Sequence, residues 1–426
     1  MPALLLHDPN ASDRCSCRPV TGLRLARIAM PHAHWRGVWV LVGTLVALLG
    51  LLPHRPDAGG LWSWGVTSVM AQSVQGFGAS TPGGSGQPVY RVKNLSDSGA
   101  GSLRDAVSKG NRNVVFDVAG EIKLSKDIWV RGAFVTIDGT TAPSPGITLK
   151  YGALLIHGSV GAHDVVVRSI RSRESKGCDT CATTGAGIGI GTGAYNVVID
   201  RVSVAKAQDQ ALGMGKGAHD VTIQWSIFAE SKSSSGTNLP VLISTGTKRV
   251  SMHHNLFIKG YERLPQAKYS DSGTQASDTQ LDLRNNLIWD WGYSATQIWK
   301  GSRANIVGNY YYDPGASDST KKRAIYLCHA KSKSPNCQTS DPKMYARAYT
   351  SGNVSGHGPA ISDYLNSLGT DSKAFAAASV SITDACTAAG QVRSKAGVRP
   401  LDSVDTTYIT MVTIGSCSAP FSVAME

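Results

Sequence analysis

Residues 196–223 read NVVIDRVSVAKAQDQALGMGKGAHDVTI, and in this stretch a polar residue followed by β-branched residues occurs twice. The two runs begin 24 residues apart, counted from Val197 to Val221. Strands are about five residues long, so roughly three strands and their turns fit into one such period. No helical run interrupts the strand-like runs, which excludes an alternation of strands and helices. Related runs recur along the chain at residues 134–137, 164–167, 249–252, 281–283 and 305–307.

A short period of this kind, with strands only, predicts units that stack on one another around a continuous core. We therefore predict an all-β protein, a right-handed parallel β-helix with coils from about residue 110 to residue 315. Residues 101–110 (GSLRDAVSKG) predict a short N-terminal capping helix with Ser102 as its N-cap. Residues 316–426 lose the period and predict an irregular closing segment, with a helix-like stretch at residues 383–395.

Asparagines follow several of the predicted strands. Asn tolerates the left-handed backbone of turns, and its amide can stack on the same residue one coil away. We predict an internal asparagine ladder, and ordinary turn asparagines are the alternative. The residues concerned are Asn255, Asn286, Asn309 and Asn353.

The first 71 residues are typical of a leader segment. An uncharged apolar run at residues 37–53 follows an arginine-containing flank, and small or apolar residues precede Gln72. Cleavage before Gln72 would release residues 72–426 as a single secreted, extracellular domain. An uncleaved membrane anchor is the alternative. After cleavage we expect no stable association with membranes.

The chain carries a formal net charge of +12. A basic surface favours an anionic partner, although solubility alone would also explain it. The lysines and arginines are scattered and form no basic helix, so we expect no nucleic-acid partner. We expect a monomer.

Six of the eight cysteines follow the leader, and an even number in an exported chain predicts disulfides. Cysteines close in sequence predict two local bridges and leave a third pair over. The predicted pairs are Cys178–Cys181, Cys328–Cys337 and Cys386–Cys417.

Several motifs, in one order, resemble the pectate lyase superfamily, polysaccharide lyase family one. The run 76–104 resembles the opening of that family, and Val198-Ile199-Asp200-Arg201 is similar to its V-W-I-D-H strand. Residues 263–268 (RLPQAK) match its R-x-P-x-x-R motif except for the last position. The resemblance covers residues 76 to about 312 and, more faintly, residues 396–405.

This resemblance implies a carbon–oxygen lyase that cleaves pectate or pectin, the acidic polysaccharide of plant cell walls, by β-elimination. A base removes the C5 proton of a uronate, and the glycosidic oxygen at C4 leaves. By position, Arg263 is the candidate catalytic base. Lys268, Lys232 and Arg201 are the candidate substrate-binding residues.

The resemblance also implies calcium, which would bridge the substrate carboxylate to acidic side chains. Asp209 matches one family ligand, and Asp179 is a second candidate. Two further ligand positions are Gly187 and Gly213 in this chain. Two alternatives therefore stay open. One is a calcium-independent, pectin lyase-like enzyme with Arg201 where the metal would be, and the other is a non-catalytic β-helix that binds acidic polysaccharide.

Overall fold

The computed structural model describes residues 73–174, 184–231, 238–270, 274–315, 323–328, 341–356 and 371–417. The described residues belong to one compact unit, residues 73–426. The predicted leader lies outside the described residues. Among the residues that the structure describes, none forms a helix that is long and apolar enough to cross a membrane.

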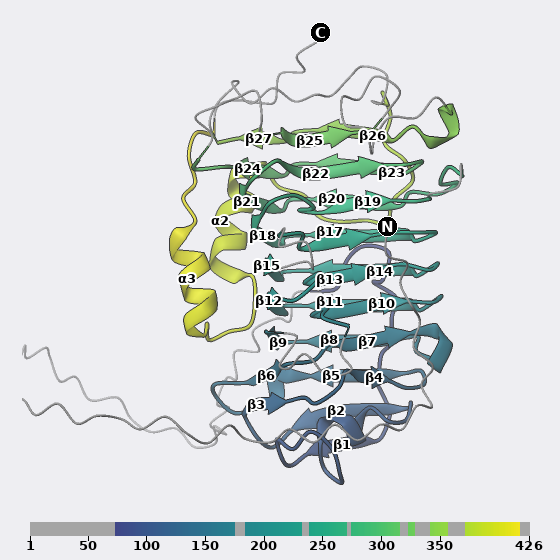
Figure 1. The fold of residues 1–426 in the computed structure, drawn as a ribbon, viewed down its shortest axis with the longest axis vertical. Coiled ribbons are helices and arrows are strands. Elements are labelled where there is room, and N and C mark those ends of the chain that lie inside the picture. Colours follow the sequence, from purple (N-terminus) through teal and green to yellow (C-terminus); the bar gives the residue numbers. More distant parts are fainter. Residues whose placement is uncertain are drawn as a thin grey trace, which may run out of the picture. The chain divides into compact units, whose positions relative to one another are not determined.

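The described strands form three sheets, and neighbouring strands within each sheet run parallel (Figure 1). The ten-stranded sheet contains β1 (Val89–Val92), β2 (Arg112–Phe116), β5 (Val135–Asp138), β8 (Val165–Arg168), β11 (Tyr195–Asp200), β14 (His219–Gln224), β17 (Lys248–His253), β20 (Leu281–Arg284), β23 (Arg303–Val307) and β26 (Arg347–Ser351). The nine-stranded sheet contains β3 (Gly120–Lys123), β6 (Ile147–Lys150), β9 (Ile170–Arg173), β12 (Ser203–Ala207), β15 (Ile227–Ser231), β18 (Leu256–Gly260), β21 (Leu287–Trp291), β24 (Tyr310–Tyr312) and β27 (Val354–Ser355). The eight-stranded sheet contains β4 (Ile128–Val130), β7 (Leu154–His157), β10 (Ile188–Gly191), β13 (Leu212–Met214), β16 (Val241–Ile243), β19 (Gln266–Lys268), β22 (Ser294–Trp299) and β25 (Arg323–Leu327).

The chain visits the ten-, nine- and eight-stranded sheets in turn and then begins the next coil, as in β11, β12 and β13 followed by β14. This is the predicted right-handed parallel β-helix. The coils run further than the sequence indicates, because β25, β26 and β27 pair with the coil before them. Long insertions separate these last strands, so their spacing hides the period.

Apolar residues at one register position hold the coils together. The register aligns them from strand to strand, and each is fully buried. Burying one such side chain contributes about 1.5–3 kcal/mol. The β-branched repeat of the sequence is therefore the inner face of the ten-stranded sheet. This column consists of Val165, Val197, Val221, Val250 and Leu281.

The predicted asparagine ladder is present. Asn286 donates from Nδ2 to Asn309 Oδ1 (2.9 Å) and accepts from Asn255 Nδ2 (3.0 Å). Asn309 in turn donates to Asn353 Oδ1 (3.0 Å). Asn255, Asn286 and Asn309 are fully buried, and Asn353 is 5 % exposed. Each side-chain amide also hydrogen-bonds to backbone groups, so the ladder provides partners for buried backbone groups at the turns between the ten- and nine-stranded sheets.

A short helix covers the N-terminal end of the coil, and two helices cover one side of it. Helix α1 (Leu103–Ala106) begins after Ser102, whose hydroxyl accepts from Asp105 N, as predicted. Three 3₁₀ turns, η1 (Gly139–Thr141), η2 (Gly158–Val160) and η3 (Pro342–Met344), interrupt the coils. The predicted helix-like stretch is α2 (Ala385–Lys395), and a further helix, α3 (Ser403–Met411), follows it.

Two of the three sheets have their outer faces covered by the described chain. Helices α2 and α3 pack on the apolar outer face of the nine-stranded sheet, where Ala389 and Tyr408 join Ile227 and Leu256 in one buried cluster (Figure 1). Residues 75–84 lie on the ten-stranded sheet, where Gly78 N donates to Thr222 Oγ1 (2.9 Å). The eight-stranded sheet carries half-exposed residues on its outer face and is therefore the place to look for a site.

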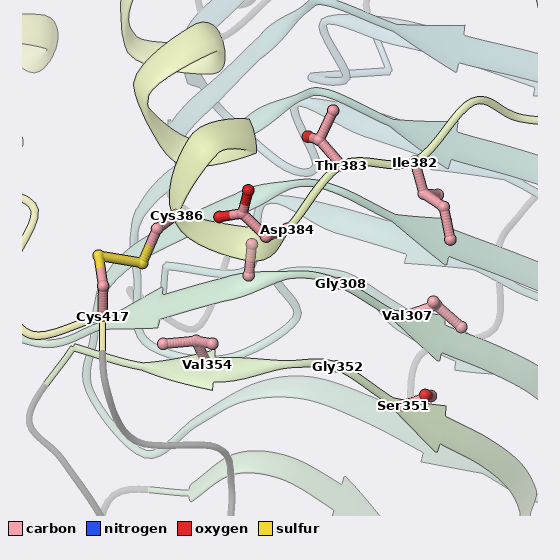
Figure 2. A pocket seen from close by; sticks show the side chains of 11 residues that line it. Val307, Gly308, Ser351, Gly352, Val354, Ile382, Thr383, Asp384, Cys386 and Cys417 are labelled. Atoms are coloured by element: carbon pink, nitrogen blue, oxygen red, sulfur yellow. A yellow bond between two sulfur atoms is a disulfide. The ribbon is translucent and has the colours of Figure 1, made fainter.

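The predicted bridge Cys386–Cys417 is confirmed. It joins the first turn of α2 to the end of the described chain (Figure 2). Cys328 is also disulfide-bonded. Its predicted partner Cys337 lies outside the described residues, as do Cys178 and Cys181.

Candidate functional site

The strand β19 carries the motif that the sequence singles out. Ala267 points into the core and is fully buried, so Gln266 and Lys268 on either side of it face outward. The register places Lys268 beside Trp299 on β22 and Gln266 beside Leu242 on β16. The chain enters this strand through the turn at residues 261–265, which contains Arg263.

The turn at Arg263 is held on both sides by neighbouring coils. Val241 N donates to Arg263 O (3.0 Å), and Leu264 N donates to Ala295 O (2.9 Å). Arg263 has a φ of 67°, in the left-handed region that costs free energy for a residue with a side chain. Such a conformation persists only where the surroundings fix it, and here backbone contacts to β16 and β22 do so.

The guanidinium of Arg263 is half-buried, and within the described ranges it takes part in no hydrogen bond or ion pair. Burial lowers the pKa of Arg263 from its usual value, whereas the carboxylates of Glu262 and Asp209 act in the opposite direction. A half-buried cation without a partner is costly. Among the described residues, no hydrogen bond or ion pair offsets this cost at Arg263.

Asp209 occupies the corresponding turn two coils earlier. It lies three residues before β13, as Arg263 lies three residues before β19, and both turns connect the nine-stranded to the eight-stranded sheet. Asp209 N donates to Gly185 O (2.9 Å), and its Oδ1 accepts from Gln210 Nε2. Burial raises the pKa of Asp209, and the charge of Arg263 and the hydrogen bond from Gln210 oppose this. The structure therefore brings Asp209 and Arg263 to the same corner of the coil.

Glu262 and Gln297 belong to this corner and were not predicted. Gln297 Nε2 donates to Glu262 Oε2 (2.9 Å) and to Ser294 Oγ (2.6 Å), and Gln297 Oε1 accepts from Gln266 Nε2 (2.5 Å). Gln297 is fully buried. The one sequence signal was the acidic residue directly before the R-x-P motif, but its partner is 35 residues further on.

Two of the predicted site residues, Lys232 and Asp179, lie outside the described residues. Lys268 is half-exposed on the outer face of β19, two residues beyond Gln266. It lies on the same strand that the Arg263 turn leads into, so the structure keeps these two predicted residues at one site.

Arg201 lies at a different corner of the coil from Asp209 and Arg263. It sits between β11 and β12, at the corner of the ten- and nine-stranded sheets, and its Nη1 pairs with both carboxylate oxygens of Asp200 (2.9 and 2.7 Å). Asp209 and Arg263 lie one turn further along the coil, at the next corner. The structure therefore does not bring Arg201 to the corner that Asp209 and Arg263 share.

The described residues do not fit a calcium site. Calcium takes six to eight oxygen ligands, and among the described residues no group of three or more His, Cys, Asp or Glu side chains gathers to hold a metal. At Gly187 an added Cβ would lie 2.2 Å from Val204 Cγ1 and 2.7 Å from Ala211 O, so no carboxylate fits there without a shift of the coil. Gly213 has more room, since its nearest neighbour would be Gln210 Oε1 at 3.4 Å.

A pocket of about 280 Å³ lies away from this corner, beside the disulfide at the start of α2 (Figure 2). Its one ionisable lining residue is Asp384. The Asp384 carboxylate caps α2 by accepting from Thr387 N (2.9 Å), and this hydrogen bond lowers its pKa. That carboxylate is engaged in the cap, so the pocket offers no chemistry comparable to that of Arg263.

The sequence is similar to several curated proteins. It is 37 % identical over 255 residues to probable pectate lyase C of Aspergillus fumigatus, which covers 59 % of this chain and 56 % of that protein. It is 27 % identical over 310 residues to probable pectate lyase 6 of Arabidopsis thaliana, covering 66 % and 63 %. The chain spans about half the length of the first of these relatives. No protein-family model matches it.

Solved structures share the fold. The cedar pollen allergen jun a 1 superposes with a TM-score of 0.55 at 19 % identity, over 76 % of this chain and 92 % of that one. A Bacillus pectate lyase in complex with trigalacturonate superposes with a TM-score of 0.53 at 17 % identity, over 76 % and 98 %. These likenesses, with the three parallel sheets, define a right-handed parallel β-helix protein. The curated relatives are named as pectate lyases, and this chain is similar to them over the matched residues.

Proposed function

We propose that this chain is a polysaccharide lyase that cleaves pectate or pectin by β-elimination, with Arg263 as the base. The observation that carries the proposal is the half-buried Arg263 guanidinium, which has no hydrogen-bond or ion-pair partner among the described residues. It lies beside an outward-facing strand in a chain with a net charge of +12, which suits a polyanionic substrate.

The reaction is an elimination across C4 and C5 of a uronate. The neutral form of Arg263 takes the C5 proton, and the electron pair left behind forms the C4–C5 double bond. The C4–oxygen bond breaks, and the departing oxygen takes a proton from water. Burial favours this chemistry because it lowers the pKa of Arg263 and so raises the neutral fraction.

Substrate binding is assigned to lysines near this turn. Lys268 is half-exposed two residues beyond Gln266 on the outer face of β19, where an ammonium can hold a uronate carboxylate as a point charge. Lys232 is the second candidate on sequence grounds. The disulfide Cys386–Cys417 supports action in an oxidising, extracellular compartment, in line with the proposed secretion.

The donor set favours the calcium-independent form of this proposal. Asp209 is one carboxylate, it accepts from Gln210, and Arg263 contributes a positive charge at the same corner. Calcium, if bound, would neutralise the substrate carboxylate. It would need ligands beyond the described residues, where Asp179 is the candidate.

The test is the absorbance of unsaturated uronate products on polygalacturonate and on methylated pectin, each with calcium and with a chelator. We expect product from at least one substrate, and we expect the rate to survive the chelator. Loss of the rate in chelator would contradict the calcium-independent form and move the ligands to Asp179 and its neighbours. Binding to either polymer with no product under any condition would favour the non-catalytic β-helix instead.

A further inference from the structure

Glu262 connects Arg263 to the next coil. Its Oε2 accepts from Gln297 Nε2 (2.9 Å), and Gln297 is fully buried and bonded to Ser294 Oγ and to Gln266 as well. The network therefore runs from the residue before Arg263, through Gln297 on the outer face of β22, to Gln266, the first residue of β19. A buried polar network with all of these bonds made is rigid.

The backbone of the same turn is fixed from the other side. Tyr261 N donates to Asn238 O (2.7 Å), and Asn238 Nδ2 donates to Lys259 O. The turn at residues 261–263 is thus held between Asn238, which precedes β16, and Gln297 on β22. Among these contacts, only the bond between Glu262 and Gln297 involves the side chain of a residue adjacent to Arg263.

The charged groups that face Arg263 in the described structure are few. Glu262 lies on its own turn and Asp209 on the turn before β13, and both carboxylates favour the protonated guanidinium. Asn238 and Gln297, on the adjacent coils, are uncharged. No described hydrogen bond or ion pair joins either carboxylate to the guanidinium. Glu262 therefore acts on Arg263 through charge and through the shape of the turn, without a direct bond.

We propose that Glu262, held by Gln297, is a positioning residue that fixes the Arg263 turn and sets the fraction of Arg263 available as a base. This inference rests on the proposed elimination activity. It separates two properties of one side chain, its hydrogen bond to Gln297 and its negative charge, and two substitutions distinguish them.

Glu262→Gln keeps an oxygen that can accept from Gln297 but removes the charge. Without that charge the neutral form of Arg263 is favoured, so the alkaline rise in kcat should move to lower pH while KM changes little. Glu262→Ala removes both properties. Because a misplacement of about 1 Å can cost roughly 10²-fold in rate, kcat should fall by about that factor at unchanged KM. Both variants are measured as pH profiles on the substrate that the parent protein cleaves.

Glu121→Gln is the matched control. Glu121 is an exposed carboxylate on β3 that pairs with Lys150 (3.1 Å), so this variant changes the net charge equally at a distant coil. Its pH profile should match that of the parent. Thermal unfolding of every variant shows whether a lower rate reflects a smaller folded fraction.

The outcomes separate the two proposals. An active parent whose pH profile is unchanged in Glu262→Gln, and whose kcat is unchanged in Glu262→Ala after correction for folding, would overturn the positioning role alone. A parent that yields no unsaturated product would overturn the proposed function as well. A shift to lower pH in Glu262→Gln but not in Glu121→Gln supports the inference.

Discussion

The arginines of this coil differ in how their charge is compensated. Arg173 is 3 % exposed and pairs with Asp405 (2.8 Å) and Asp402 (3.0 Å), which attaches α3 to the nine-stranded sheet. Arg263 is half-buried and has no such partner in the described structure. A structural arginine is buried with its counter-charges, whereas a base must remain uncompensated. Substitution should therefore change the stability of the protein much more at Arg173 than at Arg263.

Replacing Arg263 with Met should therefore leave the free energy of unfolding within about 1 kcal/mol of the parent, or raise it, because no bond is lost. Arg173→Met is the matched comparison. It removes the closer arginine from the buried Asp405 and the half-buried Asp402, which keep only Arg171 at 3.7 and 3.6 Å, and should cost up to about 3–5 kcal/mol. Denaturant unfolding measures both. A loss of more than about 3 kcal/mol in Arg263→Met would mean that the residue is structural.

Two buried histidines end the strand β17 and give the coil a pH-dependent element. His254 stacks on Trp225 with ring centroids 4.3 Å apart, and its Nδ1 lies 3.0 Å from His253 Nδ1. Burial lowers the pKa of His253 to about 3 and that of His254 to about 4, and in His254 the charge of Lys395 on α2 adds to the effect. Both rings are therefore neutral in the folded protein at pH 5.

This depression of the pKa makes the folded state acid-sensitive. Below the ordinary histidine pKa of about 6.5 the unfolded chain binds protons that the folded chain does not, so stability is full above that pH and falls as the pH drops. Each histidine contributes at most about 1.4 kcal/mol per pH unit. His254→Phe keeps a ring on Trp225 and should flatten the loss between pH 6.5 and pH 4, with little change at pH 8. An unchanged slope in denaturant unfolding would show that His254 titrates normally.

The asparagine ladder is the element that fixes one corner of the coil. Truncating the Asn286 side chain would remove its bonds to the backbone N–H of Asn255 and the carbonyl of Met252. The side chains of Asn255 and Asn309 would keep their bonds to Ile223 O and to Asn286 N. Each buried unsatisfied group costs about 1–3 kcal/mol. Asn286→Ala should therefore lower the free energy of unfolding by about two such increments, roughly 2–6 kcal/mol. Asn113→Ala, on a half-exposed position of β2, should change it by less than about 0.5 kcal/mol.

The asparagine ladder and the apolar inner column were predictable because each coil repeats the same types of residue at the same positions. The order of corners was not. Arg201 and Asp209 are eight residues apart in sequence, yet β12 separates them and they face different corners. The bond between Glu262 and Gln297 was hidden for a related reason, since it joins successive coils and no local pattern records it. The strands between residues 323 and 355 were not predicted as part of the β-helix, because long insertions separate them.

At the scale of the whole molecule, the covering segments determine where function can lie. Helices α2 and α3 take the outer face of the nine-stranded sheet, and residues 75–84 lie along the ten-stranded sheet. The turns that enter the eight-stranded sheet then present Asp209, Glu262 and Arg263 at one corner. The fold thus supplies a rigid frame, and in the proposed function the base is Arg263 at this corner.

The most direct test of this account is the rate of unsaturated product formation by Arg263→Lys, on the pectic substrate that the parent cleaves, with Arg201→Lys as control. Lysine keeps the charge but changes the position of the base, so turnover should fall roughly 10²–10⁴-fold while binding to the polymer survives. Arg201→Lys, at the corner between the ten- and nine-stranded sheets, should retain the parental rate. Parental turnover in Arg263→Lys would contradict the account, because the base would then have to be another group.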